Sequence, residues 1–151
     1  MYEYNCKVRR VVDGDTVDVD IDCGFGIVYA NQRIRLYGID TPESRTKDPI
    51  EKYFGKMAGK FLSDKLGEEC VLRTHKDKSG KYGRILGQFL VYDGVTDTQM
   101  TVNDIMIRDG LAVAYHGQSK NDVEAEHLSN RVVLSERLNV DPTDPKVNPY
   151  L

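Results

Sequence analysis

Apolar and polar residues alternate along much of the first 36 residues, a pattern typical of β-strands with one buried face. The alternation is clearest over residues 16–22, where Val17, Val19 and Ile21 are separated by aspartates. A turn signal at residues 23–26 follows, and residues 27–36 continue as a further strand. With the valine-rich segment before residue 13, this region predicts three strands.

The hydrophobic period changes at residues 51–66, where apolar residues return every three or four positions. This spacing predicts an amphipathic helix that ends at Gly67. Residues 69–75 and 84–92 return to a strand-like pattern and are joined by a basic turn at residues 76–83. The predicted buried face of the helix consists of Phe54, Met57, Ala58, Phe61, Leu62 and Leu66.

Two further helices are predicted in the last third of the chain. Residues 101–109 form the first, with Thr101 as N-cap and Gly110 just beyond its end. Residues 122–138 form the second, a polar helix whose thin apolar stripe consists of Leu128, Val132 and Leu138. Residues 141–151 contain three prolines and are expected to be irregular.

The order of these elements predicts the fold class. Three strands, a helix, two strands and two helices suit an α+β, mainly β, OB-fold, which is a five-stranded Greek-key barrel, here with three helices. Other small α+β folds also contain five strands and a helix. A chain of 151 residues is expected to hold one domain, residues 1–140, followed by the proline-containing tail 141–151.

Composition excludes several classes of protein. Three cysteines without a CxxC spacing exclude a disulfide framework and a cysteine-based zinc cluster. A net charge of −3 argues against a protein that coats nucleic acid irrespective of sequence. The charges are unevenly spread, however, because residues 13–22 hold five aspartates and residues 73–84 hold five basic residues against one acidic residue. Such runs usually belong to solvated loops.

The chain shows no sign of membrane association or export. No apolar run approaches the ~20 residues of a transmembrane helix. The N-terminus lacks a basic start followed by an apolar stretch, so it does not resemble a secretory signal. We expect a cytoplasmic monomer, or a secreted protein if a leader has been removed.

Several catalytic motifs are absent from the sequence, including the GxSxG elbow, the P-loop and HExxH. His75, His116 and His127 have no metal-ligand spacing and are expected to be surface residues or hydrogen-bonded core residues. A calcium loop starting at Asp18 is excluded, because its sixth position would be Cys23 instead of glycine.

A set of five charged residues and one threonine falls at the ends of the predicted strands and could meet at one rim of a barrel. Asp15 and Asp40 are hard oxygen ligands suited to Ca²⁺ or Mg²⁺. Two arginines can bind a phosphodiester through paired hydrogen bonds, and a carboxylate beside the metal can deprotonate a water. Taken singly, each residue has an ordinary explanation as a turn or surface residue, but together they suggest a phosphodiester hydrolase. The residues are Asp15, Arg35, Asp40, Thr41, Glu43 and Arg84.

Five segments, in order, resemble the staphylococcal nuclease (thermonuclease) family. They are residues 12–17 (VDGDTV), 35–43 (RLYGIDTPE), 51–53 (EKY), 81–84 (KYGR) and 110–112 (GLA). The resemblance covers roughly residues 8–138 and implies the OB-fold barrel with three helices.

The resemblance also implies residue roles. Asp15, Asp40 and the Thr41 carbonyl would bind Ca²⁺, and Asp13 would support them from behind. Glu43 would bind the attacking water, while Arg35 and Arg84 would bind the scissile phosphate. The neighbouring phosphate and the nucleotide would be bound by Lys81, Tyr82 and Tyr115. Gly117 stands where the family pattern has a second tyrosine.

The implied activity is that of a Ca²⁺-dependent, sugar-nonspecific endonuclease. It would cleave DNA and RNA, preferably single-stranded, and leave 3′-phosphate ends. Two alternatives remain open: a catalytically inactive OB-fold domain that binds single-stranded nucleic acid, and a domain in which calcium serves only stability.

Overall fold

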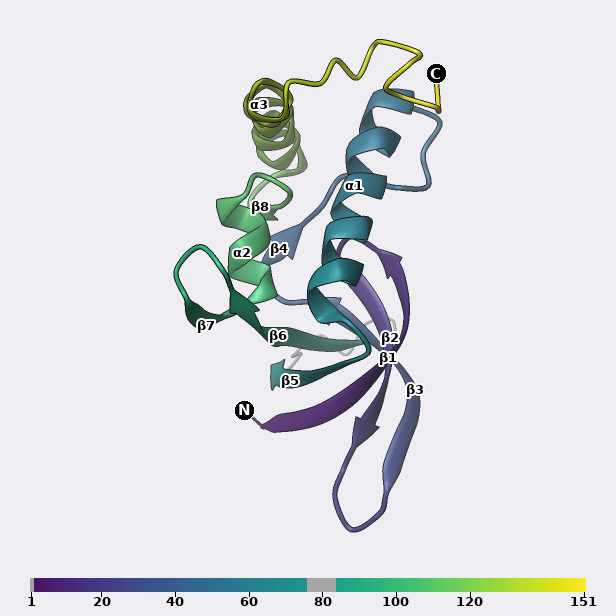
Figure 1. Cartoon of the computed structure of the whole chain (residues 1–151), viewed down its shortest axis with the longest axis vertical. Helices are drawn as coiled ribbons and strands as arrows, with labels where there is room; N and C mark the ends of the chain where they lie inside the picture. The colour runs from purple at the N-terminus through teal and green to yellow at the C-terminus, as the bar shows by residue number, and fades with distance from the viewer. Residues whose placement is uncertain (1, 76–83) are drawn as a thin grey trace.

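Residues 2–75 and 84–151 are described by a computed structural model in which five strands close a barrel and three helices flank it (Figure 1). The barrel order is β3-β2-β1-β5-β6, with antiparallel neighbours, and parallel pairing of β3 with β6 closes it. This arrangement confirms the predicted OB-fold class. The barrel strands are β1 (Glu3–Asp13), β2 (Thr16–Asp22), β3 (Val28–Leu36), β5 (Glu69–His75) and β6 (Ile85–Asp93).

The barrel interior is filled by the apolar residues that alternate along these strands. Val17 and Val19 of β2 are fully buried, as are Ile34, Leu72 and Phe89 on the strands around them. Outward-facing charges on the same strands form ion pairs across the sheet. The aspartate run of residues 13–22 lies mostly on β2, where aspartates pair with arginines of the neighbouring strands. Asp18 binds Arg33 at 2.8 Å, and Asp20 binds Arg9 at 2.7 Å.

The structure contains three short strands that the sequence pattern does not predict. β7 (Thr98–Thr101) extends the sheet beyond β6, while β4 (Ile39–Asp40) and β8 (Val113–Ala114) pair with each other outside the barrel. Elements of two to four residues are too short to show a period of two, which explains why alternation does not reveal them.

Helix α1 (Pro49–Leu66) packs against the barrel much as predicted. Asp48 caps its first turn by accepting hydrogen bonds from two backbone N–H groups, and Gly67 ends it with a φ of 64°. Phe54, Ala58 and Leu62 are buried against the barrel. Met57 and Phe61 are only partly buried at the edge of this contact.

Helix α3 (Lys120–Leu138) corrects the sequence prediction, because the predicted apolar stripe is its exposed face. Leu128, Val132 and Leu138 are 50%, 61% and 45% exposed. Val123, His127 and Leu134 are buried instead. A polar residue contributes to the buried face because His127 hydrogen-bonds to Asp40, and such a pairing is invisible to a hydrophobicity pattern.

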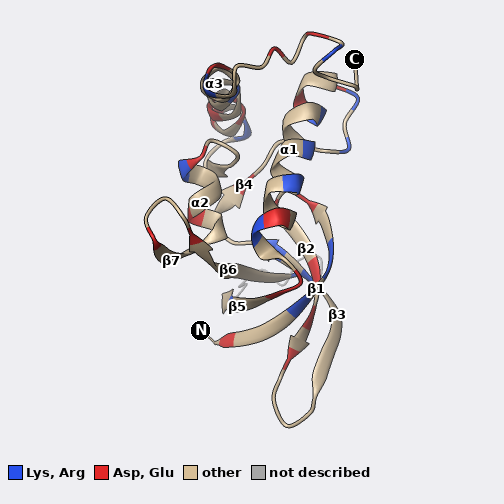
Figure 2. Ribbon diagram, in the orientation of Figure 1, with Lys and Arg blue, Asp and Glu red and all other residues tan. Residues whose placement is uncertain are grey.

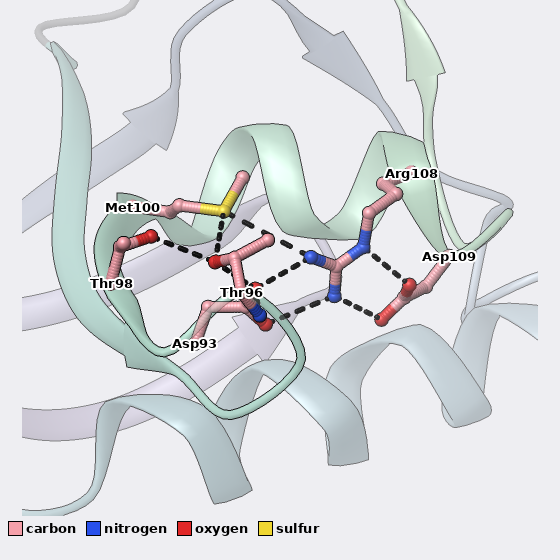
Figure 3. A network of polar contacts seen from close by, with 6 residues as sticks. All are labelled: Asp93, Thr96, Thr98, Met100, Arg108 and Asp109. Carbon is pink, nitrogen blue, oxygen red and sulfur yellow. Dashed lines mark hydrogen bonds and ion pairs between the residues drawn. The ribbon is translucent and has the colours of Figure 1, made fainter.

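Helix α2 (Val102–Arg108) begins at the predicted N-cap Thr101 and is tied to the β6–β7 turn by a polar network (Figure 3). Arg108 binds both carboxylate oxygens of Asp93, at 2.7 and 3.0 Å, and also binds Asp109. Thr96 donates a further hydrogen bond to Asp93 at 2.7 Å. The buried carboxylate of Asp93 is therefore fully paired, and the network fixes α2 to the sheet.

Residues 141–151 form turns without a helix or strand and lie along the start of α1 (Figure 1). The buried Asn148 amide donates hydrogen bonds to the carbonyls of Pro49 and Pro142. None of the helices within residues 2–75 and 84–151 is long and apolar enough to cross a membrane.

Acidic and basic residues are both spread over the described fold (Figure 2), although the charged residues of β2 are all acidic. The basic turn that the sequence predicts, residues 76–83, lies outside the described residues.

Candidate active site

The β1–β2 turn carries Asp13 and Asp15 to one end of the barrel. Asp15 accepts hydrogen bonds from the Thr16 hydroxyl at 3.0 Å and from the Thr41 backbone N–H at 3.4 Å. Gly14 lets this turn approach the chain around Thr41, because a Cβ at position 14 would come within 2.8 Å of the Thr41 side chain. Gly14 thus sets how closely Asp15 and Thr41 approach each other.

Arg35 lies between the two predicted metal-binding carboxylates. One of its terminal nitrogens, Nη2, is 3.4 Å from Asp15 Oδ2 and 3.7 Å from Asp40 Oδ1. The other, Nη1, donates to the Leu36 carbonyl at 3.0 Å. The β2–β3 register pairs Arg35 with Thr16, the neighbour of Asp15, so the sheet itself brings this pair of charges together.

Asp40 is positioned by the small β4–β8 sheet, in which it pairs with Val113. Its second oxygen, Oδ2, is 2.7 Å from Nε2 of His127 on α3. The sequence allows His127 to be either a surface residue or a hydrogen-bonded core residue. Its burial fits the second alternative, but the sequence does not show that the partner is a predicted metal ligand. No sequence signal could have identified the contact, since 87 residues separate the two.

Glu43 follows this segment and lies against α1. Burial raises the pKa of its carboxyl, and repulsion from Asp13, Asp15 and Asp40 adds to the rise. The repulsion comes from a local excess of negative charge at this end of the barrel, and burial is the larger cause of the raised pKa. A carboxylate with a raised pKa is a stronger base and is better suited to accept a proton from water.

A cleft of about 640 Å³ opens beside these groups, and its lining includes Asp40, Thr41, Glu43, Tyr115 and His127. The exposed Tyr115 follows β8 and is anchored by a backbone hydrogen bond from its N–H to the Gly38 carbonyl. A larger cleft of about 850 Å³ lies between the β2–β3 hairpin and strands β1 and β5, away from every predicted site residue.

Gly117, which replaces the second tyrosine of the family pattern, has a φ of 93°. Side chains with a Cβ rarely adopt this backbone conformation. The departure from the family pattern therefore has a structural reason, since the turn after Tyr115 takes a path that favours glycine.

The remaining predicted residues lie next to or within the segment that joins β5 to β6. Arg84 immediately precedes β6, whose first residues pair with β3 as Ile85 with Ile34 and Leu86 with Arg35. Lys81 and Tyr82 lie outside the described residues.

The donor atoms at this end of the barrel fit a hard divalent cation. Asp15 and Asp40 supply carboxylate oxygens, and burial raises the pKa of Asp15 even though Arg35 opposes the rise. The buried Thr41 hydroxyl has no hydrogen-bond partner among the described residues. Within residues 2–75 and 84–151, no three His, Cys, Asp or Glu side chains converge as a metal cluster.

The fold and these groups define a class of protein: an OB-fold domain with carboxylates and an arginine gathered at one end of its barrel. These residue types suit the binding of a cation and of phosphate. Residues 33–134 match the family model described as staphylococcal nuclease homologue, and the chain belongs to the staphylococcal nuclease family.

Known relatives agree with this assignment. The chain is 35% identical over 122 residues to the micrococcal nuclease of Shigella flexneri, covering 78% of this chain and 62% of that protein. It is 33% identical over 109 residues to the thermonuclease of Staphylococcus intermedius, covering 71% and 57%. An uncharacterized endonuclease of Escherichia coli is 32% identical over 142 residues, covering 92% and 80%. The chain thus spans little more than half of the thermonuclease.

Proposed function

We propose that the protein is a calcium-dependent endonuclease that hydrolyses phosphodiester bonds in DNA and RNA, preferably single-stranded, and leaves 3′-phosphate ends. Membership of a family whose relatives carry the names nuclease and endonuclease supports the reaction class. The observation that carries the proposal is the position of Arg35 between Asp15 and Asp40, because an arginine suited to phosphate and two carboxylates suited to a cation lie side by side.

Asp15, Asp40 and the Thr41 carbonyl would hold the calcium ion. When bound, the ion would supply positive charge that lowers the cost of charge building up on the phosphate. Arg35 would then exchange its carboxylate partners for phosphate oxygens. Its planar guanidinium can bind two such oxygens at once, which a lysine cannot do. Arg84, Lys81 and Tyr82 would bind the substrate phosphates from the β5–β6 segment, and Asp13 would support the acidic cluster.

Glu43 would act as the general base. It would accept a proton from water as the water oxygen bonds to phosphorus and the bond from phosphorus to the 5′ oxygen breaks. The leaving oxygen takes up a proton and becomes a 5′-hydroxyl, and the phosphate stays on the 3′ oxygen. Tyr115 beside the cleft offers an aromatic face for a nucleotide, a contact that tolerates any base and favours single strands.

The test is cleavage of an end-labelled single-stranded DNA, the matching duplex and an RNA, each with Ca²⁺ or with a chelator. We expect calcium-dependent cleavage, faster on single strands, with ends that a 3′-phosphatase modifies. Glu43→Gln should lower turnover by roughly 10²–10⁴-fold while nucleotide binding is retained. Binding of single strands without cleavage would instead support an inactive OB-fold domain. If calcium stabilises the protein but nucleic acid is neither bound nor cleaved, the ion has only a structural role.

A further inference from the structure

His127 is a buried residue of α3 whose ring reaches a predicted calcium ligand. The residue is 8% exposed, and its Nε2 lies 2.7 Å from Asp40 Oδ2. An ionised carboxylate can only accept hydrogen bonds, so Nε2 donates this one. The buried imidazole of His127 thus hydrogen-bonds to one particular oxygen of Asp40, Oδ2.

The two oxygens of Asp40 consequently have different surroundings. Oδ2 is taken by His127, whereas Oδ1 faces Arg35 Nη2 at 3.7 Å. The same nitrogen is 3.4 Å from Asp15 Oδ2, so Oδ1 is the Asp40 oxygen directed towards Asp15. A cation shared by the two aspartates would meet Asp40 through Oδ1.

Contacts other than the one with Asp40 hold the helix that carries His127. Ser119 caps the start of α3, and Asn139 ends it in the left-handed conformation. Asn130 donates to the Ala112 carbonyl at 3.3 Å, and Arg137 donates to the Asp109 carbonyl at 2.6 Å. Because the bonds from Asn130 and Arg137 also dock α3 beside β8, the bond to Asp40 is not the sole contact that places His127.

We propose that His127 is a positioning residue, which holds Asp40 Oδ2 and presents Oδ1 to the calcium ion. The inference rests on the proposed function, because it assumes that Asp40 binds the ion. Carboxylates that bind metals are commonly oriented by a hydrogen bond of this kind, and loss of the bond typically costs ~10–100-fold in metal affinity. His127 does not touch substrate in this scheme and acts only through Asp40.

The experiment compares three variants with the wild type by calorimetric titration with Ca²⁺ alone and by denaturation of the metal-free protein. His127→Leu removes the donor and keeps an apolar side chain between Val123 and Leu134, whereas His127→Gln keeps an N–H donor at similar reach. Asn130→Ala is the control, because it removes another hydrogen bond of α3 without touching Asp40. Should His127→Leu fail to fold, His127→Asn replaces it, since its shorter amide cannot reach Asp40.

We expect His127→Leu to bind calcium roughly 10–100-fold more weakly, with His127→Gln recovering most of the affinity. Asn130→Ala should be less stable and bind calcium as the wild type does. Unchanged calcium affinity in His127→Leu, beside a wild type that binds calcium and cleaves, would overturn this inference and leave the proposed function intact. A wild type that binds no calcium would overturn both.

Discussion

The backbone of Glu43 lies directly against Gly55 of α1, so closely that a Cβ at position 55 would come within 2.5 Å of the Glu43 carbonyl oxygen. A glycine in the middle of a helix usually costs stability relative to alanine. Here it allows the chain that carries the predicted general base to lie against the helix. The contact couples the packing of α1 to the position of Glu43.

Gly55→Ala should therefore destabilise the protein, by roughly 1–3 kcal/mol as for other overpacked sites, and should slow cleavage by moving Glu43. Gly59→Ala is the matched control on the same helix, because a Cβ at position 59 would lie 4.0 Å from its nearest neighbour, the backbone nitrogen of Gly14. The control should gain roughly 0.5–1 kcal/mol and keep its activity. Urea denaturation and single-turnover cleavage measure both effects. If the two variants behave alike, the close approach of Glu43 to α1 has no role in positioning.

A second prediction separates the geometry of Arg35 from its charge. Arg35→Lys keeps the charge but loses the planar pair of donors, so it should slow cleavage by roughly 10²-fold or more. Arg33→Lys is the control two residues earlier on β3, where the guanidinium binds Asp18. It should change the rate only a few-fold. Equal losses in single-turnover assays at several salt concentrations would show that both arginines supply only diffuse positive charge.

The acidic surroundings of Glu43 predict a pH dependence. Burial, and next the charge of Asp13, raise the pKa of Glu43, and a general base works only when deprotonated. Asp13→Asn should therefore lower that pKa and move the acid limb of the rate profile to lower pH. Carbon-13 NMR titration of the Glu43 carboxyl in the metal-free protein checks the shift directly. A titration curve identical to that of the wild type would show that Asp13 does not act on Glu43.

The Asp93–Arg108 network predicts an acid dependence of stability rather than of activity. Hydrogen bonds from Arg108 and Thr96 hold the pKa of Asp93 well below its usual value of 3.8. A depressed pKa contributes stability that is full above that usual value and is lost as pH falls towards the native pKa. Asp93→Asn should therefore be less stable than the wild type at pH 7, and the gap should narrow towards pH 2. If the difference in stability between the variant and the wild type did not change with pH, the loss would come from altered packing and not from the charge of Asp93.

The sequence predicts the barrel and the approach of Asp15 to Arg35 because both follow from strands that are adjacent in the chain. Alternation defines β2 and β3, and their register then brings Asp15 close to Arg35. The contact between Gly55 and Glu43 could not be predicted in this way, because it comes from the tertiary fold.

The misread face of α3 has a similar origin. Leu128 and Val132 form the more obvious apolar stripe, yet the helix buries His127, since a hydrogen bond to Asp40 stabilises that orientation. A pattern of hydrophobicity assigns no value to a polar residue that finds its partner 87 positions away.

The separation between Asp40 and His127 also has a consequence for how the chain matures during synthesis. All five barrel strands precede residue 94, so the barrel can close as soon as that part of the chain has left the ribosome. At that stage β8 and α3, which place Val113 and His127 beside Asp40, have still to emerge from the ribosome. The nascent protein would pass through a folded barrel with an incompletely ordered carboxylate, and the site would reach its final geometry only once α3 has packed beside it.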